Sequence, residues 1–253
     1  EGTGFHVGGG FIVTNRHIAV EPWKADERVQ SLSASVNGQF RLTRLVAYFP
    51  GHRQPFVLRF RQASSRDDLA VCTIEGRDVP EKLPALPLNM DSDAVVTGQA
   101  VVLMGYPKGV DRIMASLPEA ESRNLQMRYG NSLGSLLAAL AERNLIKPLT
   151  TQGHITELDE HRLSYDARSA QGGSGAPLFG QTGRVIGINF MMYVEMPDAN
   201  YAVPVRYAAS LLQRAGWKPP ETSPAEAAAA GNTNTTQKDP RPTAPGSKPP
   251  SDR

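Results

Sequence analysis

One serine, Ser174, lies in the small-residue segment Gln171-Gly172-Gly173-Ser174-Gly175-Ala176-Pro177-Leu178, and all five histidines of the chain precede it. A serine hydroxyl becomes a strong nucleophile only when a neighbouring histidine accepts its proton and an acid orients that histidine. Glycines around a serine allow a sharp turn and bring backbone N–H groups toward a developing oxyanion. The position of the histidines therefore limits the folds that could use Ser174 for chemistry.

Three chain orders of serine, histidine and acid are well known, and each belongs to a different fold. The α/β-hydrolase order needs a histidine after the serine, but the last histidine of this chain is His161. The subtilisin order needs an aspartate before the histidine, and none precedes the best candidate, His17. Only the order His, Asp, Ser fits, so the acid must lie between His17 and Ser174.

The candidate base and acid each lie beside an apolar strand. His17 follows the apolar, β-branched run at 11–13 and a short turn, and Asp68 stands directly before the buried-looking strand at 69–74. Asp67 competes for the acid role, but the alternation of the strand favours Asp68. Taken singly, a loop histidine, a capping aspartate and a turn serine are ordinary structural residues. The catalytic hypothesis depends on their occurring together in this order.

Seven short segments occur in a characteristic order between residue 2 and about residue 215. They are residues 2–5, 12–17, 68–71, 105–107, 172–178, 185–189 and 201–204. By these segments the chain resembles the trypsin-like serine endopeptidases, and within them the protease domain of the bacterial HtrA (Deg) proteins. The resemblance implies an all-β fold of two six-stranded-type antiparallel barrels, chymotrypsin-like, with the first strand missing from this sequence.

The resemblance also implies the roles of individual residues in a serine endopeptidase. His17 would be the general base, Asp68 its orienting acid and Ser174 the nucleophile that forms an acyl-enzyme. The backbone N–H groups of Gly172 and Ser174 would form the oxyanion hole. The substrate-binding pocket would be lined by Arg168, Gln171, Tyr201, Ala202 and Val203.

The serine segment departs from the family pattern, which usually has Asp or Asn where this chain has Gly173. Gly173 offers no side chain to anchor the turn, so a more mobile oxyanion loop is expected. No carboxylate occurs at 168–171, so a preference for Lys or Arg lacks its counter-charge. We therefore expect cleavage after small aliphatic residues. An Arg168 turned inward would favour acidic residues instead, but burying an unpaired charge is costly.

The expected organisation is a protease domain at 1–217, with barrels at about 1–80 and 90–217, and a tail at 218–253. The tail is rich in Pro, Ala, Ser and Thr and is predicted to be disordered. A helical insertion is expected at about 108–148, because Leu133, Leu136, Leu137 and Leu140 form one stripe. We expect it to pack on the barrel surface, with an active-site lid or a partner-docking element as the alternatives. A second helix is expected at 206–215, with no PDZ domain after it.

Composition excludes several other functions. The net charge is +2 and basic residues are scattered, which argues against nucleic-acid binding. Cys72 is the only cysteine, so a disulfide framework is excluded. The histidines and acids at 154–161 match no zinc signature, so neither a metal nor another cofactor is expected. No apolar run in this chain is long enough to cross a membrane.

The expected partners are protein or peptide substrates, and the sequence does not determine the oligomeric state. The chain begins with Glu1, so we interpret it as a fragment or a processed product. By resemblance, an extracytoplasmic location is favoured, either periplasmic or anchored through a segment upstream. The alternative function is a catalytically inactive trypsin-like module that binds or senses a partner.

Overall fold

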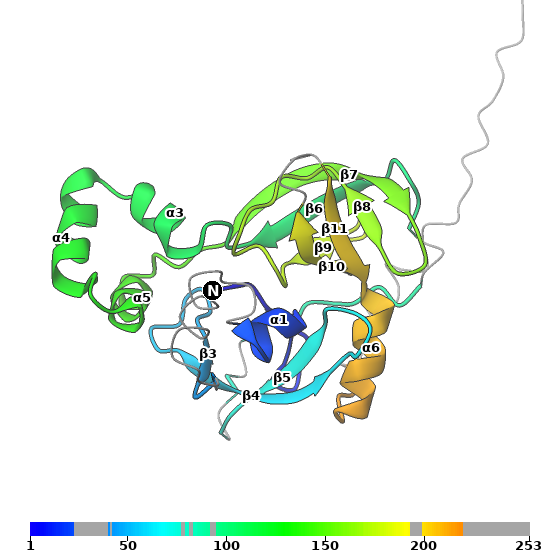
Figure 1. Cartoon of the computed structure of the whole chain (residues 1–253), viewed down its shortest axis with the longest axis horizontal. Coiled ribbons are helices and arrows are strands. Elements are labelled where there is room, and N and C mark those ends of the chain that lie inside the picture. Colours follow the sequence, from blue (N-terminus) through cyan, green and yellow to red (C-terminus); the bar gives the residue numbers. More distant parts are fainter. Residues whose placement is uncertain are drawn as a thin grey trace, which may run out of the picture. The chain divides into compact units, whose positions relative to one another are not determined.

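The computed structural model of the chain contains two antiparallel β-sheets and several helices (Figure 1). Its described residues are 1–22, 40, 42–76, 79–80, 83–91, 95–192 and 199–219. The expected tail lies outside the described residues from residue 220 onward.

The first sheet has five strands in the described part of the chain, and neighbouring strands are antiparallel. In sheet order they are β1 (Phe5–His6), β2 (Phe11–Thr14), β5 (Ala70–Ile74), β4 (Phe56–Ala63) and β3 (Leu45–Ala47). Among these residues the sheet is a curled half-barrel, which together with the closed second barrel agrees with the expected all-β fold. Strand β3 is short, and its three residues pair with β4.

Alternation along β2 and β5 sends side chains into two different cores. Ile12 pairs with Cys72, and both side chains are buried on one face of the sheet. Val13 pairs with Val71, and both are buried on the other face, in a cluster shared with helix α6. Strands that are buried on both faces need apolar residues at successive positions. This requirement explains the uninterrupted apolar run at 69–72.

The second sheet is a closed six-stranded antiparallel barrel, as predicted. Around the barrel its strands are β10 (Val185–Met192), β11 (Asn200–Pro204), β8 (Leu163–Tyr165), β7 (Leu149–Leu158), β6 (Ala100–Gly105) and β9 (Pro177–Phe179). Leu103, Ile155, Leu163 and Leu178 are among the side chains that form its core. Closure leaves no free strand edge. Strand β9, which follows the turn at Ser174, is therefore paired on both sides, with β10 and β6.

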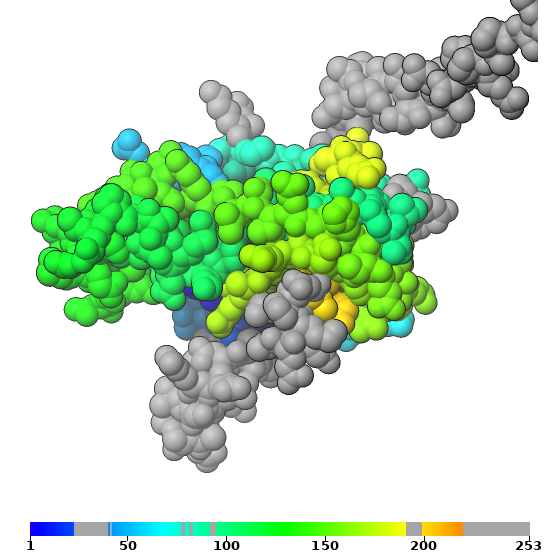
Figure 2. All heavy atoms as spheres, turned by 90° about the horizontal axis from the view of Figure 1, so that it is seen from above, coloured from blue at the N-terminus to red at the C-terminus, as the bar shows by residue number. Residues whose placement is uncertain are grey.

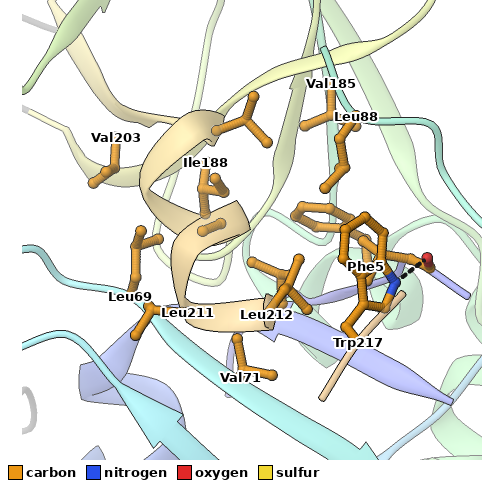
Figure 3. Close-up of a cluster of buried hydrophobic side chains, with 14 residues drawn as sticks. Phe5, Leu69, Val71, Leu88, Val185, Ile188, Val203, Leu211, Leu212 and Trp217 are labelled. Carbon is orange, nitrogen blue, oxygen red and sulfur yellow. Dashed lines mark hydrogen bonds between the residues drawn. The ribbon is translucent and has the colours of Figure 1, made fainter. Parts of the chain in front are cut away.

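Helix α6 (Val205–Arg214) follows β11 and contacts β4 and β5 of the first sheet and β10 and β11 of the second. Its Leu211 and Leu212 are buried in the core cluster of Figure 3, among residues from both sheets. Each fully buried leucine contributes about 1.5–3 kcal/mol to stability. Beyond the helix, the indole N–H of Trp217 donates a hydrogen bond of 2.8 Å to the carbonyl of Val7. The cluster therefore holds the two sheets together.

Three helices form the insertion between β6 and β7: α3 (Gly109–Ala115), α4 (Glu119–Tyr129) and α5 (Leu133–Glu142). They share a small core in which Leu136 and Leu140 are buried, and they form the green projection in Figure 2. Leu133, expected in the same stripe, is 49% exposed, because it is the first residue of α5 and lies outside the packed turns. Tyr48 and Tyr106 pack against this core and join it to both sheets.

Helices long and apolar enough to span a membrane do not occur in the described ranges.

Candidate active site

His17 is the second residue of the short helix α1 (Arg16–Ala19), and Asn15 alone separates this helix from β2. Asn15, between them, is fully buried, and its side-chain amide donates a hydrogen bond of 2.7 Å to the backbone carbonyl of Asp68. This bond ties the turn that carries His17 to the turn that precedes β5. The side chain of His17 remains 27% exposed, so its ring is accessible from the surface.

The carboxylate of Asp68 contacts His17 in two places. Its Oδ2 lies 2.5 Å from His17 Nδ1, and its Oδ1 accepts a hydrogen bond of 3.0 Å from the backbone N–H of His17. A carboxylate at Nδ1 keeps the ring proton there and leaves Nε2 free to accept another. Asp67 points elsewhere, because its carboxylate accepts a bond from Ser64 Oγ and lies 3.5 Å from His161 Nδ1. Of the two adjacent acids, the structure brings Asp68 to His17.

Ser174 lies in the tight turn that leads into β9, between two glycines with left-handed backbones. The φ angles of Gly172 and Gly175 are 91° and 85°. A Cβ on Gly172 would lie 2.6 Å from the carbonyl oxygen of Tyr106, and one on Gly175 would lie 2.0 Å from that of Thr3. Both positions combine a conformation that favours glycine with the close approach of another backbone. The turn therefore requires glycine at these two positions.

Two distant segments hold the first half of this turn. The backbone N–H of Lys108 donates a hydrogen bond of 2.6 Å to the carbonyl of Gln171. The hydroxyl of Thr3 donates a bond of 2.7 Å to the carbonyl of Gly172 and accepts one of 3.1 Å from the N–H of Tyr106. Thr3 is only 4% exposed, so these bonds are shielded from water. The segment at 106–108, which directly precedes the insertion, and the N-terminal segment therefore both hold the serine turn in place.

The second half of the turn is held by Asn189 of β10. Its Nδ2 donates to the carbonyl of Gly173 at 2.9 Å and to Ser169 Oγ at 3.1 Å, and its Oδ1 accepts a bond of 2.7 Å from the Tyr165 hydroxyl. Burial raises the pKa of Tyr165, so this hydroxyl remains a donor. Nothing in the sequence indicated that Thr3 or Asn189 supports the serine turn. Thr3 belongs to the segment at 2–5, and by resemblance the region of Asn189 and Phe190 was expected only as part of the pocket wall.

Among the residues that the structure describes, the backbone N–H groups of Gly172 and Ser174 have no hydrogen-bond acceptor, and neither has that of Gln171, an exposed residue at the start of the turn. The N–H of Gly173, between them, donates to the carbonyl of Ala170 at 2.8 Å. Unpaired backbone donors are uncommon in folded proteins. A pair of free donors beside a serine is what the stabilisation of an oxyanion requires.

Ser174 Oγ makes no hydrogen bond to His17 within the described part of the chain. The bond between a catalytic serine and its base is often long when no substrate is bound. The structure thus joins His17 to Asp68 directly and presents Ser174 separately, on the turn before β9.

The residues predicted to line the substrate pocket have different surroundings. Arg168 and Gln171 are exposed, and Tyr201 is half-buried. Ala202 is buried in the core of the closed barrel, whereas Val203 belongs to the core cluster of Figure 3. The exposed side chain of Arg168 keeps its charge in contact with water.

A shallow groove of about 740 Å³ lies beside β6 and β7. Its lining includes His154, Asp166 and Arg168, but neither His17 nor Ser174. The groove is therefore separate from the residues of the predicted triad.

The two histidines considered as metal ligands have other neighbours. The backbone N–H of His154 donates to Asp166 Oδ1 at 2.5 Å. The ring of His161 stacks on Tyr207, with ring centroids 4.8 Å apart. In the described ranges, no group of three or more His, Cys, Asp or Glu residues is arranged to hold a metal ion.

The curled sheet, the closed six-stranded barrel and the final helix α6 define the chymotrypsin-like fold. His17 and Asp68 lie beside strands of the first sheet of this fold and Ser174 beside a strand of the second, and the N–H groups of Gly172 and Ser174 have no acceptor among the described residues. A family model of the trypsin-like peptidase domain matches residues 2–188. The chain therefore belongs to the trypsin-like peptidase domain family.

Relatives of the chain come from the HtrA and DegP group. A "probable periplasmic serine endoprotease DegP-like" of Pseudomonas fluorescens is 25% identical over 211 residues, which cover 82% of this chain and 33% of the relative. The chain thus spans about one third of that relative's length.

Solved structures share the fold. The serine endoprotease from Yersinia pestis matches with a TM-score of 0.55 and 19% identity, over 85% of this chain and 57% of its own. The HtrA-type protease AlgW with a decapeptide matches with a TM-score of 0.55 and 18% identity, over 92% and 60%.

Proposed function

We propose that residues 1–217 are a serine endopeptidase domain that uses His17, Asp68 and Ser174. The observation that carries the proposal is the contact of 2.5 Å between His17 Nδ1 and Asp68 Oδ2 in a chain of the trypsin-like peptidase family. This contact fixes the ring tautomer in which Nε2 can accept a proton.

The proposed reaction proceeds through an acyl-enzyme. Ser174 Oγ attacks the carbonyl carbon of the scissile peptide while His17 Nε2 accepts its proton, and the carbonyl oxygen becomes an oxyanion. His17 then gives the proton to the leaving amine, and the acyl group stays on Ser174. Water, deprotonated by His17, attacks the ester and releases the acid. Asp68 stabilises the imidazolium in both halves of the reaction.

The free N–H groups of Gly172 and Ser174 support this mechanism, because they are the donors that the oxyanion needs. In another serine protease, removing one oxyanion donor costs about 2.7–4 kcal/mol of transition-state stabilisation. Because the carbonyls of the turn are already bonded, the donors need little reorganisation when charge develops.

For the substrate, we propose cleavage after small aliphatic residues such as Val, Ala or Leu. The stretch 168–171 contains no carboxylate to pair with a basic side chain, which argues against a preference for Lys or Arg. Arg168 is exposed, so an acidic preference has little support. Mass spectrometry of a digested peptide library tests this, since dominant cleavage after Lys or Arg would contradict the pocket proposal.

A fluorophosphonate probe tests the activity itself, because it labels only an activated serine. We expect labelling of the parent protein and none of Ser174→Ala, which should keep the fold and lose a factor on the order of 10⁶ in kcat. Casein hydrolysis by purified Ser174→Ala at the parent rate would refute the assignment.

The second candidate is a catalytically inactive module that binds or senses a partner. The absence of a hydrogen bond between Ser174 Oγ and His17 in the described structure favours it. The fluorophosphonate probe distinguishes the active peptidase from the inactive module, because a parent protein that stays unlabelled under all conditions is not an activated serine hydrolase.

For the location, we propose an extracytoplasmic compartment. The supporting observation is the relative from Pseudomonas fluorescens, which is named as periplasmic. Cell fractionation with an antibody against residues 1–217 tests this, and recovery in the cytosolic fraction alone would contradict it.

A further inference from the structure

We propose that Asn189 is a positioning residue of the oxyanion hole, whose side-chain amide orients the peptide group that carries the N–H of Ser174. This inference rests on the proposed peptidase function and concerns the same site. Asn189 belongs to β10, in the wall of the closed barrel, and touches neither His17 nor Asp68 through any hydrogen bond among the described residues.

One peptide group links Gly173 to Ser174. The carbonyl of Gly173 and the N–H of Ser174 belong to this planar trans unit, so they point in opposite directions. Asn189 Nδ2 holds that carbonyl at 2.9 Å. The N–H of Ser174 must therefore point away from Asn189, and it has no acceptor among the described residues.

A second donor to the same carbonyl leaves Asn189 a distinct role. The N–H of Ala176 bonds the Gly173 carbonyl at 3.0 Å, and Ala176 is itself held to β10, because its carbonyl accepts a bond of 2.9 Å from the backbone N–H of Asn189. That backbone pairing remains in an Asn189→Ala variant, but it holds the chain after Ser174. The side-chain amide of Asn189 is the bond from β10 that reaches the peptide group between Gly173 and Ser174 directly.

The orientation of the Asn189 amide is itself fixed. Asn189 is 2% exposed, and its Oδ1 accepts the hydroxyl proton of Tyr165, which is fully buried. With Oδ1 committed to Tyr165, only Nδ2 faces the turn, where it meets the carbonyl of Gly173 and Ser169 Oγ. Tyr165 thus acts on the turn through Asn189.

Gly173 cannot provide an anchor of its own. A Cβ at this position would lie 2.7 Å from Ser169 Oγ and 2.9 Å from the carbonyl oxygen of Ala170, closer than side-chain carbons normally come. The same Cβ would lie 3.4 Å from Asn189 Nδ2. The space beside Gly173 is thus occupied by Ser169 Oγ and the carbonyl of Ala170, and the side-chain anchor comes from Asn189 of β10.

The test compares Asn189→Ala with Asn200→Ala. Asn200 is an equally buried asparagine of the same barrel, but its Nδ2 donates to the carbonyl of Ala167, away from the serine turn. We expect Asn189→Ala to lower kcat by about 10- to 100-fold with KM unchanged, which is less than the roughly 10²–10³ that loss of one oxyanion donor costs, because the donor is misoriented and not removed. Affinity for a peptide boronate, whose adduct occupies the oxyanion hole, should fall in parallel. Asn200→Ala should lower only the melting temperature.

Tyr165→Phe provides a second test that keeps the buried ring. It should lower kcat in the same direction and by less, and the double variant should match Asn189→Ala, because Tyr165 acts through Asn189. The pH dependence of kcat should keep its midpoint in all variants, since the His17–Asp68 pair is untouched.

The outcomes separate the two proposals. A parent protein that fluorophosphonate does not label overturns the proposed function and this inference with it. A labelled parent whose Asn189→Ala variant keeps the parental kcat overturns the inference alone. If Asn189→Ala does not fold, Tyr165→Phe decides, and an unchanged kcat and boronate affinity in that variant overturn the inference.

Discussion

The backbone N–H of Thr3 donates a hydrogen bond of 2.8 Å to the carbonyl of Ser174. Thr3 precedes the first strand of the first sheet, whereas Ser174 precedes β9 of the closed barrel. The bond therefore joins the two sheets directly at the predicted nucleophile. The hydroxyl of the same threonine holds the carbonyl of Gly172, so one residue supports the serine turn at two points.

Thr3→Val should destabilise the protein although the two side chains have nearly the same shape. The change leaves the buried carbonyl of Gly172 and the N–H of Tyr106 without their partner, and an unpaired buried polar group costs about 1–3 kcal/mol. Urea denaturation measures the free energy of unfolding. Thr3→Ser, which keeps the hydroxyl, is the matched control and should lose much less. Equal stability of the Val variant and the parent would show that this hydroxyl is dispensable.

Asp68→Asn should lower kcat by about 10⁴, because an asparagine at this position favours the wrong tautomer of His17. The fold should be retained, which circular dichroism can check. Asp67→Asn is the matched control, since the neighbouring acid contacts Ser64 and His161 instead. We expect it to keep kcat and to lose about 0.5–1.5 kcal/mol of stability. The reverse pattern of activities would assign the acid role to Asp67.

His6 should make the protein less stable in acid. Its Nε2 accepts the N–H of Gly10, its Nδ1 lies 3.2 Å from the carbonyl of Pro84, and burial lowers its pKa below the usual 6.5. In the unfolded chain His6 binds a proton more readily, so its contribution to stability is complete above pH 6.5. That contribution is lost as the pH falls through the lowered pKa of the folded state.

His6→Gln isolates this effect, because glutamine does not titrate. The difference in unfolding free energy between parent and variant should be constant above pH 6.5 and should shift against the parent as the pH falls. Denaturant titrations at a series of pH values measure it. A difference that does not change with pH would mean that His6 does not carry the acid sensitivity.

Cys72 should resist alkylation in the folded protein. The residue is fully buried in β5, and burial raises the pKa of its thiol to about 12, so almost none of the reactive thiolate is present. Iodoacetamide at slightly alkaline pH should label it only in denaturant. Ser210→Cys, at an exposed position of α6, supplies a thiol that should react at once. Labelling of native Cys72 at the same rate would contradict the buried state.

Local patterns were sufficient for much of the fold and for one half of the site. The apolar runs at 11–13 and 69–74 predicted the strands beside His17 and Asp68, and a helix was expected at 206–215, close to the bounds of α6. The contact between His17 and Asp68 followed from two short segments, each of which ends or begins a strand. Strands, helices and the turns next to them depend on residues that are neighbours in the chain, so they can be predicted from local sequence.

The support of the serine turn could not be predicted in the same way. Thr3 bonds Gly172 across 169 positions of the chain, and Asn189 reaches Gly173 only because the barrel closes. A threonine before a strand and an asparagine in an apolar run give no sign of these partners. The exposure of Leu133 was missed for a related reason, since a helical stripe does not reveal where packing begins.

The bond from Trp217 to Val7 has a consequence for the order in which the chain folds. Val13 and Val71 of the first sheet are buried in a cluster that also contains Leu211, Leu212 and Trp217, which are synthesised much later. This core can therefore be completed only after residue 217 has been made. We expect the first sheet to gain its full stability, and the two halves of the proposed site to be held together, no earlier than that.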